Sequence, residues 1–162
     1  MTDNPSHHKI PRLVPGILFA LAALWLYWPV LRPGALLFGN DTIFHDYIML
    51  FYGWSALKHG SLSLWLPHLY CGIPFIGSFA FCPWYPPALA FLVVPFPLAF
   101  NLQYILHSFL AGAFTYRLLR AMNLDRISSG FGGLAFQLCG HFATLAYPGH
   151  LQKVQAIVWI PL

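Results

Sequence analysis

Residues 13–31 read LVPGILFALAALWLYWPVL, nineteen uncharged residues bounded by Arg12 and Arg32. As an α-helix this stretch is about 28 Å long, which is enough to cross the hydrocarbon core of a bilayer. A secretory signal peptide also begins with basic residues before an apolar run. The apolar region of a signal peptide is usually only about 7–15 residues long, however, and no A-x-A cleavage pattern follows here. The stretch therefore predicts an uncleaved helix that spans a membrane.

The composition of the whole chain agrees with a lipid environment. Of its 162 residues, 59% are hydrophobic, 18% are aromatic and only 7% are charged. Soluble domains carry roughly 25% charged residues, so this chain lacks the groups for a water-facing surface. Its apolar content also excludes a disordered protein. The net charge of +4 is spread too thinly for a nucleic-acid partner. We expect an all-α integral membrane protein that contacts membrane lipid.

Three further apolar runs follow the first. They cover about residues 97–116, 127–147 and from 154 onward, so the sequence predicts three full spans and a truncated fourth. Ser129 and Gly133 form a small-xxx-small pair that allows another helix to approach closely. No turn or charge interrupts residues 156–162, so we interpret residues 13–162 as the N-terminal part of a longer polytopic domain that follows a tail over 1–12.

A long loop, residues 32–96, separates the first two spans. Within it, five apolar residues recur at helical spacing over 41–59, which predicts a helix that lies along the membrane interface: Phe44, Tyr47, Ile48, Phe51 and Trp54. The next segment, 61–87, is rich in Pro and Gly, which exclude one continuous helix. Residues 88–94 are apolar but too short to cross, so they predict an interfacial or re-entrant piece.

The basic residues indicate the orientation of the chain. By the positive-inside rule, the tail and the loop after the second span face the cytoplasm, with Lys9, Arg12, Arg117, Arg120 and Arg126. The loop over 32–96 then faces the outside. The prediction is a multi-pass protein of the cytoplasmic membrane with a cytoplasmic N-terminus.

Asp41 and Asp46 are the two carboxylates near the outer membrane surface. A carboxylate there avoids most of the cost of about 2.5–3.5 kcal/mol that it meets at the bilayer centre, so it can stay ionised and reach a lipid-anchored substrate. Two alternatives remain open. Asp41 can simply cap the interfacial helix, and Asp46 can lie on a solvated helix face.

A second polar cluster lies before the last apolar run. It contains His150, Gln152, Lys153 and Gln155. These side chains can hold an anionic headgroup, or they can form a polar interfacial cap on the helix. Gln103 and His107, four residues apart, are expected to bond neighbouring segments rather than a metal.

The three cysteines lack the spacing of a metal site. Cys71 and Cys82 share the outer loop, where they can form a disulfide in an oxidising compartment or remain as two thiols.

Several short motifs, in this order and spacing, resemble the YfhO-like bacterial membrane proteins of the GT-C superfamily of glycosyltransferases. They are Gly39-Asn40-Asp41-Thr42, His45-Asp46-Tyr47, Gly60-Ser61-Leu62-Ser63-Leu64-Trp65, Gly72-Ile73-Pro74, Tyr85-Pro86, Gly149-His150 and Trp159-Ile160-Pro161-Leu162.

The resemblance implies a multi-span helical bundle that transfers a sugar from a polyprenyl-phosphate donor to a cell-envelope acceptor on the outer face of the bacterial inner membrane. It implies that the acidic residue of the first outer loop, Asp41, is catalytic, with Asp46 as a second candidate. Some members of the superfamily use a divalent cation, and Mg²⁺ or Mn²⁺ at Asp41 is one option. His150, Gln152, Lys153 and Gln155 are the candidate substrate-binding residues.

Two other classes of protein compete with this interpretation. A transporter or lipid flippase would need charged or broken-helix sites near the membrane midplane, and the charges here cluster at its surface. A non-catalytic membrane subunit is the third class, and a GT-C fragment without its further helices is expected to be inactive.

Overall fold

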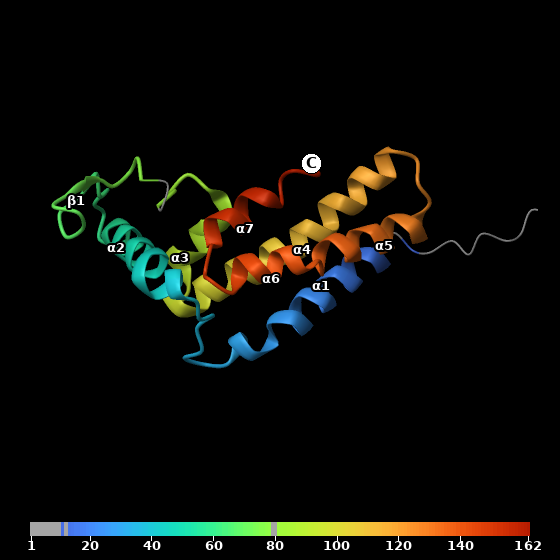
Figure 1. The fold of residues 1–162 in the computed structure, drawn as a ribbon, viewed down its shortest axis with the longest axis horizontal. Coiled ribbons are helices and arrows are strands. Elements are labelled where there is room, and N and C mark those ends of the chain that lie inside the picture. The colour runs from blue at the N-terminus through green and yellow to red at the C-terminus, as the bar shows by residue number, and fades with distance from the viewer. Residues whose placement is uncertain (1–10, 12, 79–80) are drawn as a thin grey trace, which may run out of the picture.

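The computed structural model describes residues 11, 13–78 and 81–162, so most of the predicted tail over 1–12, including Lys9 and Arg12, lies outside the described residues. The chain is mostly helical, which confirms the all-α prediction, and the one sheet among these residues is a two-stranded hairpin (Figure 1). In chain order the elements are α1 (Val14–Tyr27), η1 (Trp28–Leu31), η2 (Thr42–Asp46), α2 (Tyr47–Lys58), β1 (Trp65–Leu66), β2 (Ile73–Pro74), η3 (Pro86–Leu89), α3 (Ala90–Val93), α4 (Phe96–Ala121), α5 (Arg126–Gln137), α6 (Gly140–Ala146) and α7 (Leu151–Ile157).

The stretch of the first predicted span forms a helix. α1 and η1 together cover Val14–Leu31, with Pro15 in the first turn, where the missing N–H costs nothing. Among the described residues this is the one helix that is long and apolar enough to cross a membrane. That it crosses a membrane stays a prediction.

α4 is the long central helix. It has 26 residues and packs along both α1 and α5 (Figure 1). It therefore begins and ends beyond the predicted 97–116. Its hydropathy is reduced by polar residues that are fully buried in the protein, among them Asn101, Gln103 and His107.

The apolar stretch 127–147 was predicted as one span, and that prediction is wrong. It divides into α5, of 12 residues, and α6, of 7 residues, because Cys139 is extended and interrupts the helix. α5 is only about 18 Å long at 1.5 Å per residue. Asp125 caps α5, and hydrogen bonds, chiefly from Ser128, lower the pKa of its carboxyl group.

The small-xxx-small pair in α5 does what its spacing predicts. Ser129 and Gly133 are both buried against neighbouring helices. A Cβ atom on Gly133 would lie 2.7 Å from the Phe19 ring of α1 and 2.8 Å from the Gly112 carbonyl oxygen of α4. The absence of a side chain at Gly133 therefore lets α1, α4 and α5 meet.

The last helix differs from the predicted run. α7 begins at Leu151, three residues before the predicted start, and ends at Ile157, where a turn follows. Its seven residues extend only about 10 Å. Its N-terminal end thus contains the polar residues that the sequence placed before a fourth span.

The helix predicted over 41–59 forms over η2 and α2 and ends before Gly60, whose φ of +77° favours glycine. On its predicted apolar face, Phe44, Ile48 and Phe51 are exposed and Trp54 is buried. The position of this helix along a membrane interface stays a prediction. Asp46, at the end of the π-helical turn η2, is buried.

The rest of the segment over 32–96 follows its Pro and Gly content. Residues 61–78 and 81–85 are irregular apart from the hairpin, in which Trp65 pairs with Pro74 and Leu66 with Ile73. The apolar piece predicted over 88–94 is built from η3 and α3. Cys71 and Cys82 are exposed free thiols in this structure.

Candidate functional site

The candidate site is a pocket between the start of the interfacial helix and the start of α7. Its volume is about 560 Å³, within the range of small-molecule sites. It is lined by Asp41, Phe44, His45, Asp46, Tyr70, Ser78, His150, Gln152 and Lys153. The two polar clusters identified in the sequence are therefore brought together, with one exception, Gln155.

Close backbone contacts hold the two halves of the pocket together. The Asp41 N–H donates to the Pro148 carbonyl oxygen at 2.8 Å. A Cβ atom on Gly39 would lie 2.5 Å from the Pro148 carbonyl carbon, and one on Gly149 would lie 2.6 Å from the Thr42 nitrogen. Both glycines are buried, and Gly149 has a φ of +101°. Only glycine, which has no side chain, allows these two backbone segments to come so close.

Asp41 faces the pocket rather than capping its helix. Its side chain accepts no capping hydrogen bond from the following backbone. One carboxylate oxygen lies 3.3 Å from Nδ1 of His150, and half of the Asp41 side chain is exposed. The capping alternative is thus wrong, and the Asp41 carboxylate is accessible to a ligand.

Asp46 forms a tighter pair, with the adjacent His45. Its Oδ1 atom lies 2.8 Å from Nδ1 of His45. Only 6% of the Asp46 side chain is exposed, so the solvated-face alternative is wrong, whereas 47% of the His45 side chain is exposed. Its Oδ2 atom is buried without a hydrogen-bond partner among the described residues. The sequence analysis did not select His45 as a site residue, although its position beside Asp46 was a signal.

The α7 wall of the pocket contributes a cation and a free donor. Lys153 is exposed, and Nε2 of Gln152 is buried without a partner among the described residues. His150, half-buried, lies next to Asp41. These three residues match the predicted substrate-binding cluster.

Gln155, the fourth predicted substrate-binding residue, turns away from the pocket. Its Nε2 atom donates to Oε1 of Gln103 on α4, at 3.2 Å. Gln152 and Gln155 are three residues apart in α7. That spacing separates them by about 60° around the helix, so Gln155 packs against α4 while Gln152 lines the pocket.

The polar residues of α4 bind neighbouring segments, as predicted for Gln103 and His107. Nε2 of Gln103 donates to the Pro87 carbonyl oxygen at 2.8 Å. Nδ1 of His107 donates to the Gln103 carbonyl oxygen at 2.6 Å, which leaves Nε2 to accept from the Tyr85 hydroxyl at 2.5 Å. Trp159 donates to that hydroxyl at 3.0 Å. Burial raises the pKa of Tyr85, which keeps the phenol protonated as a donor.

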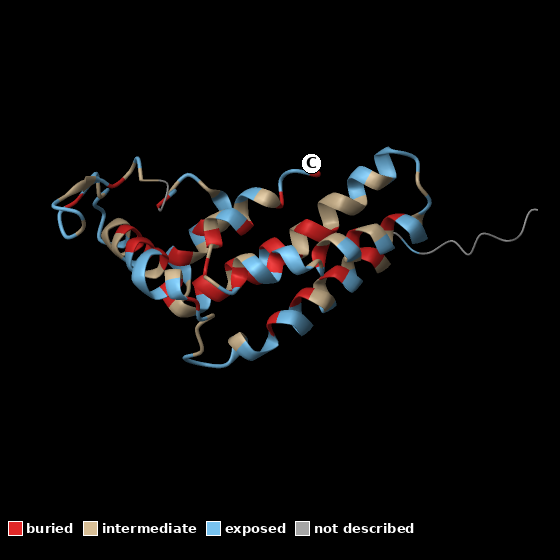
Figure 2. Cartoon of the chain, in the orientation of Figure 1, coloured by how far each residue is buried: buried red, intermediate tan, exposed pale blue. Residues whose placement is uncertain are grey.

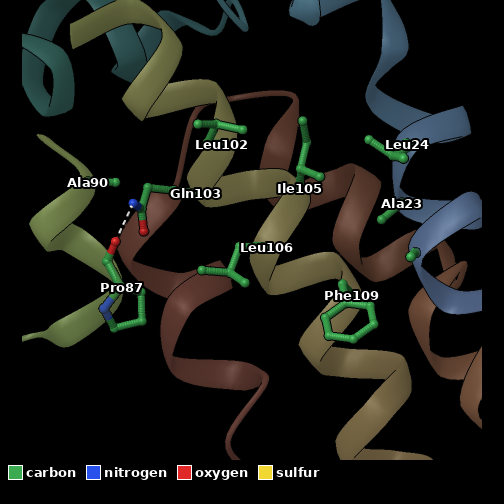
Figure 3. Close-up of a pocket in the computed structure, with 10 residues that line it drawn as sticks. Ala23, Leu24, Pro87, Ala90, Leu102, Gln103, Ile105, Leu106 and Phe109 are labelled. Atoms are coloured by element: carbon green, nitrogen blue, oxygen red, sulfur yellow. Dashed lines mark hydrogen bonds between the residues drawn. The ribbon is translucent and has the colours of Figure 1, made fainter. Parts of the chain in front are cut away.

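Gln103 also lines a second cavity, which is distinct from the candidate pocket. It has a volume of about 480 Å³ between α1, α4 and the segment from η3 to α3, and Figure 3 shows its lining. Apart from Gln103, whose amide is bonded to Pro87, the lining side chains are apolar, such as Leu24, Leu106 and Phe109. This cavity offers no group for catalysis.

The donors in the pocket do not fit a metal ion. Among residues 11, 13–78 and 81–162, no group of three or more His, Cys, Asp or Glu side chains is placed to hold one. Asp41 and Asp46 each lie against a histidine instead of converging. Mg²⁺ and Mn²⁺ prefer several converging oxygen ligands, so the chemistry below uses no metal.

The comparison with known proteins identifies no relative of this chain. No protein-family model, curated protein or solved structure matches this chain. The pocket and the sequence are therefore the basis for its function.

Proposed function

We propose that this chain is part of a membrane glycosyltransferase that moves a sugar from a polyprenyl-phosphate donor to a cell-envelope acceptor. The observation that carries the proposal is the single pocket in which Asp41 and Asp46 meet His150, Gln152 and Lys153. Such a pocket offers a proton acceptor on one wall and a cation on the other. Sugar transfer from a phosphate ester needs both.

A membrane location is supported by the surface of α1. Only 22% of the window over Val14–Leu31 is buried inside the protein. Its exposed side chains include Ile17, Leu21 and Trp25, and Figure 2 shows exposed residues along the outward side of α1. An apolar surface of this length is typical of contact with lipid or with further helices.

The two ends of the protein support the proposed orientation. The turn between α4 and α5, with Arg120 and Arg126 beside it, lies at the same end as the start of α1 (Figure 1). The hairpin and α2 lie at the opposite end (Figure 1). With the basic end in the cytoplasm, the residues over 32–96 face the outside. We propose that the helix over Val14–Leu31 and α4, of about 27 and 39 Å, span the membrane within a bundle of GT-C type.

The chemistry of transfer assigns one task to each wall. The acceptor hydroxyl attacks the anomeric carbon, and its proton passes to the Asp41 carboxylate. The new bond joins the acceptor oxygen to that carbon, while the bond from the carbon to the phosphate oxygen breaks. The electron pair leaves with the polyprenyl phosphate, whose charge Lys153 and the Gln152 amide stabilise.

The experiment that tests this function is sugar transfer in proteoliposomes. The complete protein is supplied with polyprenyl phosphate carrying a radiolabelled hexose and with a cell-envelope extract as acceptor. We expect label to move from the lipid to the acceptor. If label crosses the bilayer but stays on its lipid, the protein is a flippase instead, a class favoured by the break between α5 and α6. If neither occurs, the chain is a non-catalytic subunit.

The proposed orientation makes a separate prediction for the cysteines. Cys71 and Cys82 are exposed and lie in the outer loop, so a membrane-impermeant maleimide should label them in intact cells. The control is a variant with both replaced by serine, which keeps only the half-buried Cys139. Labelling of Cys71 and Cys82 only after the cells are opened would contradict the orientation.

A further inference from the structure

We propose that His45, oriented by Asp46, binds a hydroxyl group of the sugar that is transferred. This inference rests on the proposed function, because it assigns the sugar end of the donor to one wall of the same pocket. It concerns a residue that the sequence analysis left without a role.

The contact between Asp46 and His45 determines which ring nitrogen is free. A carboxylate oxygen accepts hydrogen bonds, so Nδ1 of His45, 2.8 Å from Oδ1 of Asp46, donates its proton. In the neutral ring the other nitrogen, Nε2, then has a lone pair and accepts hydrogen bonds. Since His45 lines the pocket and 47% of its side chain is exposed, this acceptor is available to a ligand.

The burial of Asp46 indicates that its hydrogen bond with His45 is part of the folded structure. A buried carboxylate is costly unless it is hydrogen-bonded, and Asp46 retains a buried oxygen, Oδ2, with no partner among the described residues. Both residues line the pocket, but His45 is far more exposed than Asp46, the residue that the sequence suggested as a second catalytic carboxylate. We assign Asp46 as a positioning residue and His45 as the residue that contacts the ligand.

Two aromatic side chains of the same pocket fit a sugar. Phe44 and Tyr70 line the pocket with 79% and 78% of their surface exposed, so their rings are uncovered. Tyr70 has a φ of +49°, an unfavourable conformation for a residue with a side chain, of the kind that clusters at ligand sites. Apolar ring faces beside a few placed polar groups are typical of small-molecule sites.

The opposite wall fits the phosphate end of the same molecule. Lys153 and the free Gln152 donor are on α7, and they offer hydrogen-bond donors to an anion. The pocket thus offers two kinds of group. His45 can accept a hydrogen bond from a hydroxyl group, and the α7 residues can donate to phosphate.

The test compares lipids with and without a sugar. The complete protein in nanodiscs is titrated with bare undecaprenyl phosphate and with undecaprenyl phosphate carrying glucose, galactose, mannose or N-acetylglucosamine. We expect at least one sugar lipid to bind more tightly than the bare lipid. His45→Phe, which keeps a ring but removes both nitrogens, should weaken the binding of that sugar lipid about 3–10-fold, which is the contribution of one hydrogen bond. The affinity for the bare lipid should stay unchanged.

Two further variants complete the design. Asp46→Leu should weaken the binding of the sugar lipid in the same direction, because leucine removes the acceptor that orients the ring of His45. His59→Phe is the matched control, since His59 is an exposed histidine after α2 that bonds only the Ser55 carbonyl oxygen and lies outside the pocket lining. It should change neither affinity.

Three results would overturn the inference. One is equal binding of bare and sugar lipids by the wild type, and another is an equal loss for both lipids in His45→Phe. The third is an unchanged affinity with a lower transfer rate at saturating donor, which would make His45 a proton-transfer residue. Sugar discrimination that depends on His45 without any transfer would instead leave this inference standing and contradict the proposed function.

Discussion

Asp41→Asn should lower sugar transfer by about 100–10,000-fold, the usual contribution of a general base. Asparagine has the same shape as aspartate but cannot take the proton of the acceptor hydroxyl. The fold should survive, because the Asp41 side chain makes no capping bond and the contact to Pro148 uses the backbone N–H. The measurement is the initial rate of label transfer in proteoliposomes, with protein insertion checked by protease protection.

Two results separate this prediction from a general loss of function. Asp125→Asn is the control, since Asp125 caps α5 at the turn after α4 and lies outside the pocket lining. It should keep most of the transfer rate. Wild-type transfer rates in Asp41→Asn would contradict a role for Asp41 as the proton acceptor.

Gly149→Ala should destabilise the protein by about 2–4 kcal/mol, the sum of a strained backbone and an overpacked contact. Gly149 has a φ of +101°, and an added Cβ would overlap the Thr42 side chain and lie 2.6 Å from its backbone nitrogen. The shift that relieves this overlap separates the segment of Asp41 from that of His150. Transfer should fall together with stability.

Gly140→Ala is the matched control for this variant. Gly140 begins α6, and an added Cβ there meets no atom within 4 Å. Alanine favours helices over glycine by about 1 kcal/mol, so this variant should be as stable as the wild type or slightly more stable. Denaturant unfolding in detergent, followed by tryptophan fluorescence, compares the two. Equal stability of Gly149→Ala and the wild type would contradict the close contact at Thr42.

Local sequence was enough for several parts of the fold. Long uncharged runs predicted the helices of α1 and α4, and the many Pro and Gly residues predicted the irregular segment over 61–85. It was not enough for 127–147, because the hydropathy of this stretch does not show that the helix is interrupted at Cys139. Hydropathy reports burial or lipid contact, but not whether the backbone continues as one helix.

The sequence predicted which types of residue form the candidate site, but not how those residues are arranged in space. Residue type and position drew attention to Asp41, His150 and Lys153, and the resemblance to a known family implied the catalytic role of Asp41. The same reasoning left open whether Asp41 caps a helix, and it passed over His45. It also grouped Gln155 with the pocket, although that side chain bonds Gln103.

The amino-acid sequence by itself determined that this chain is helical, that it is too apolar for an ordinary water-facing surface, and that its few polar groups gather in two short segments. Only the tertiary structure decided that these segments share one pocket, that Asp46 is buried against His45, and that the Asp41 carboxylate is accessible to a ligand. The physical reason is the separation along the sequence between the residues that interact. Helix formation depends on neighbours within a few turns, whereas the pocket depends on Gly39 and Gly149, which let two distant stretches of backbone come into contact.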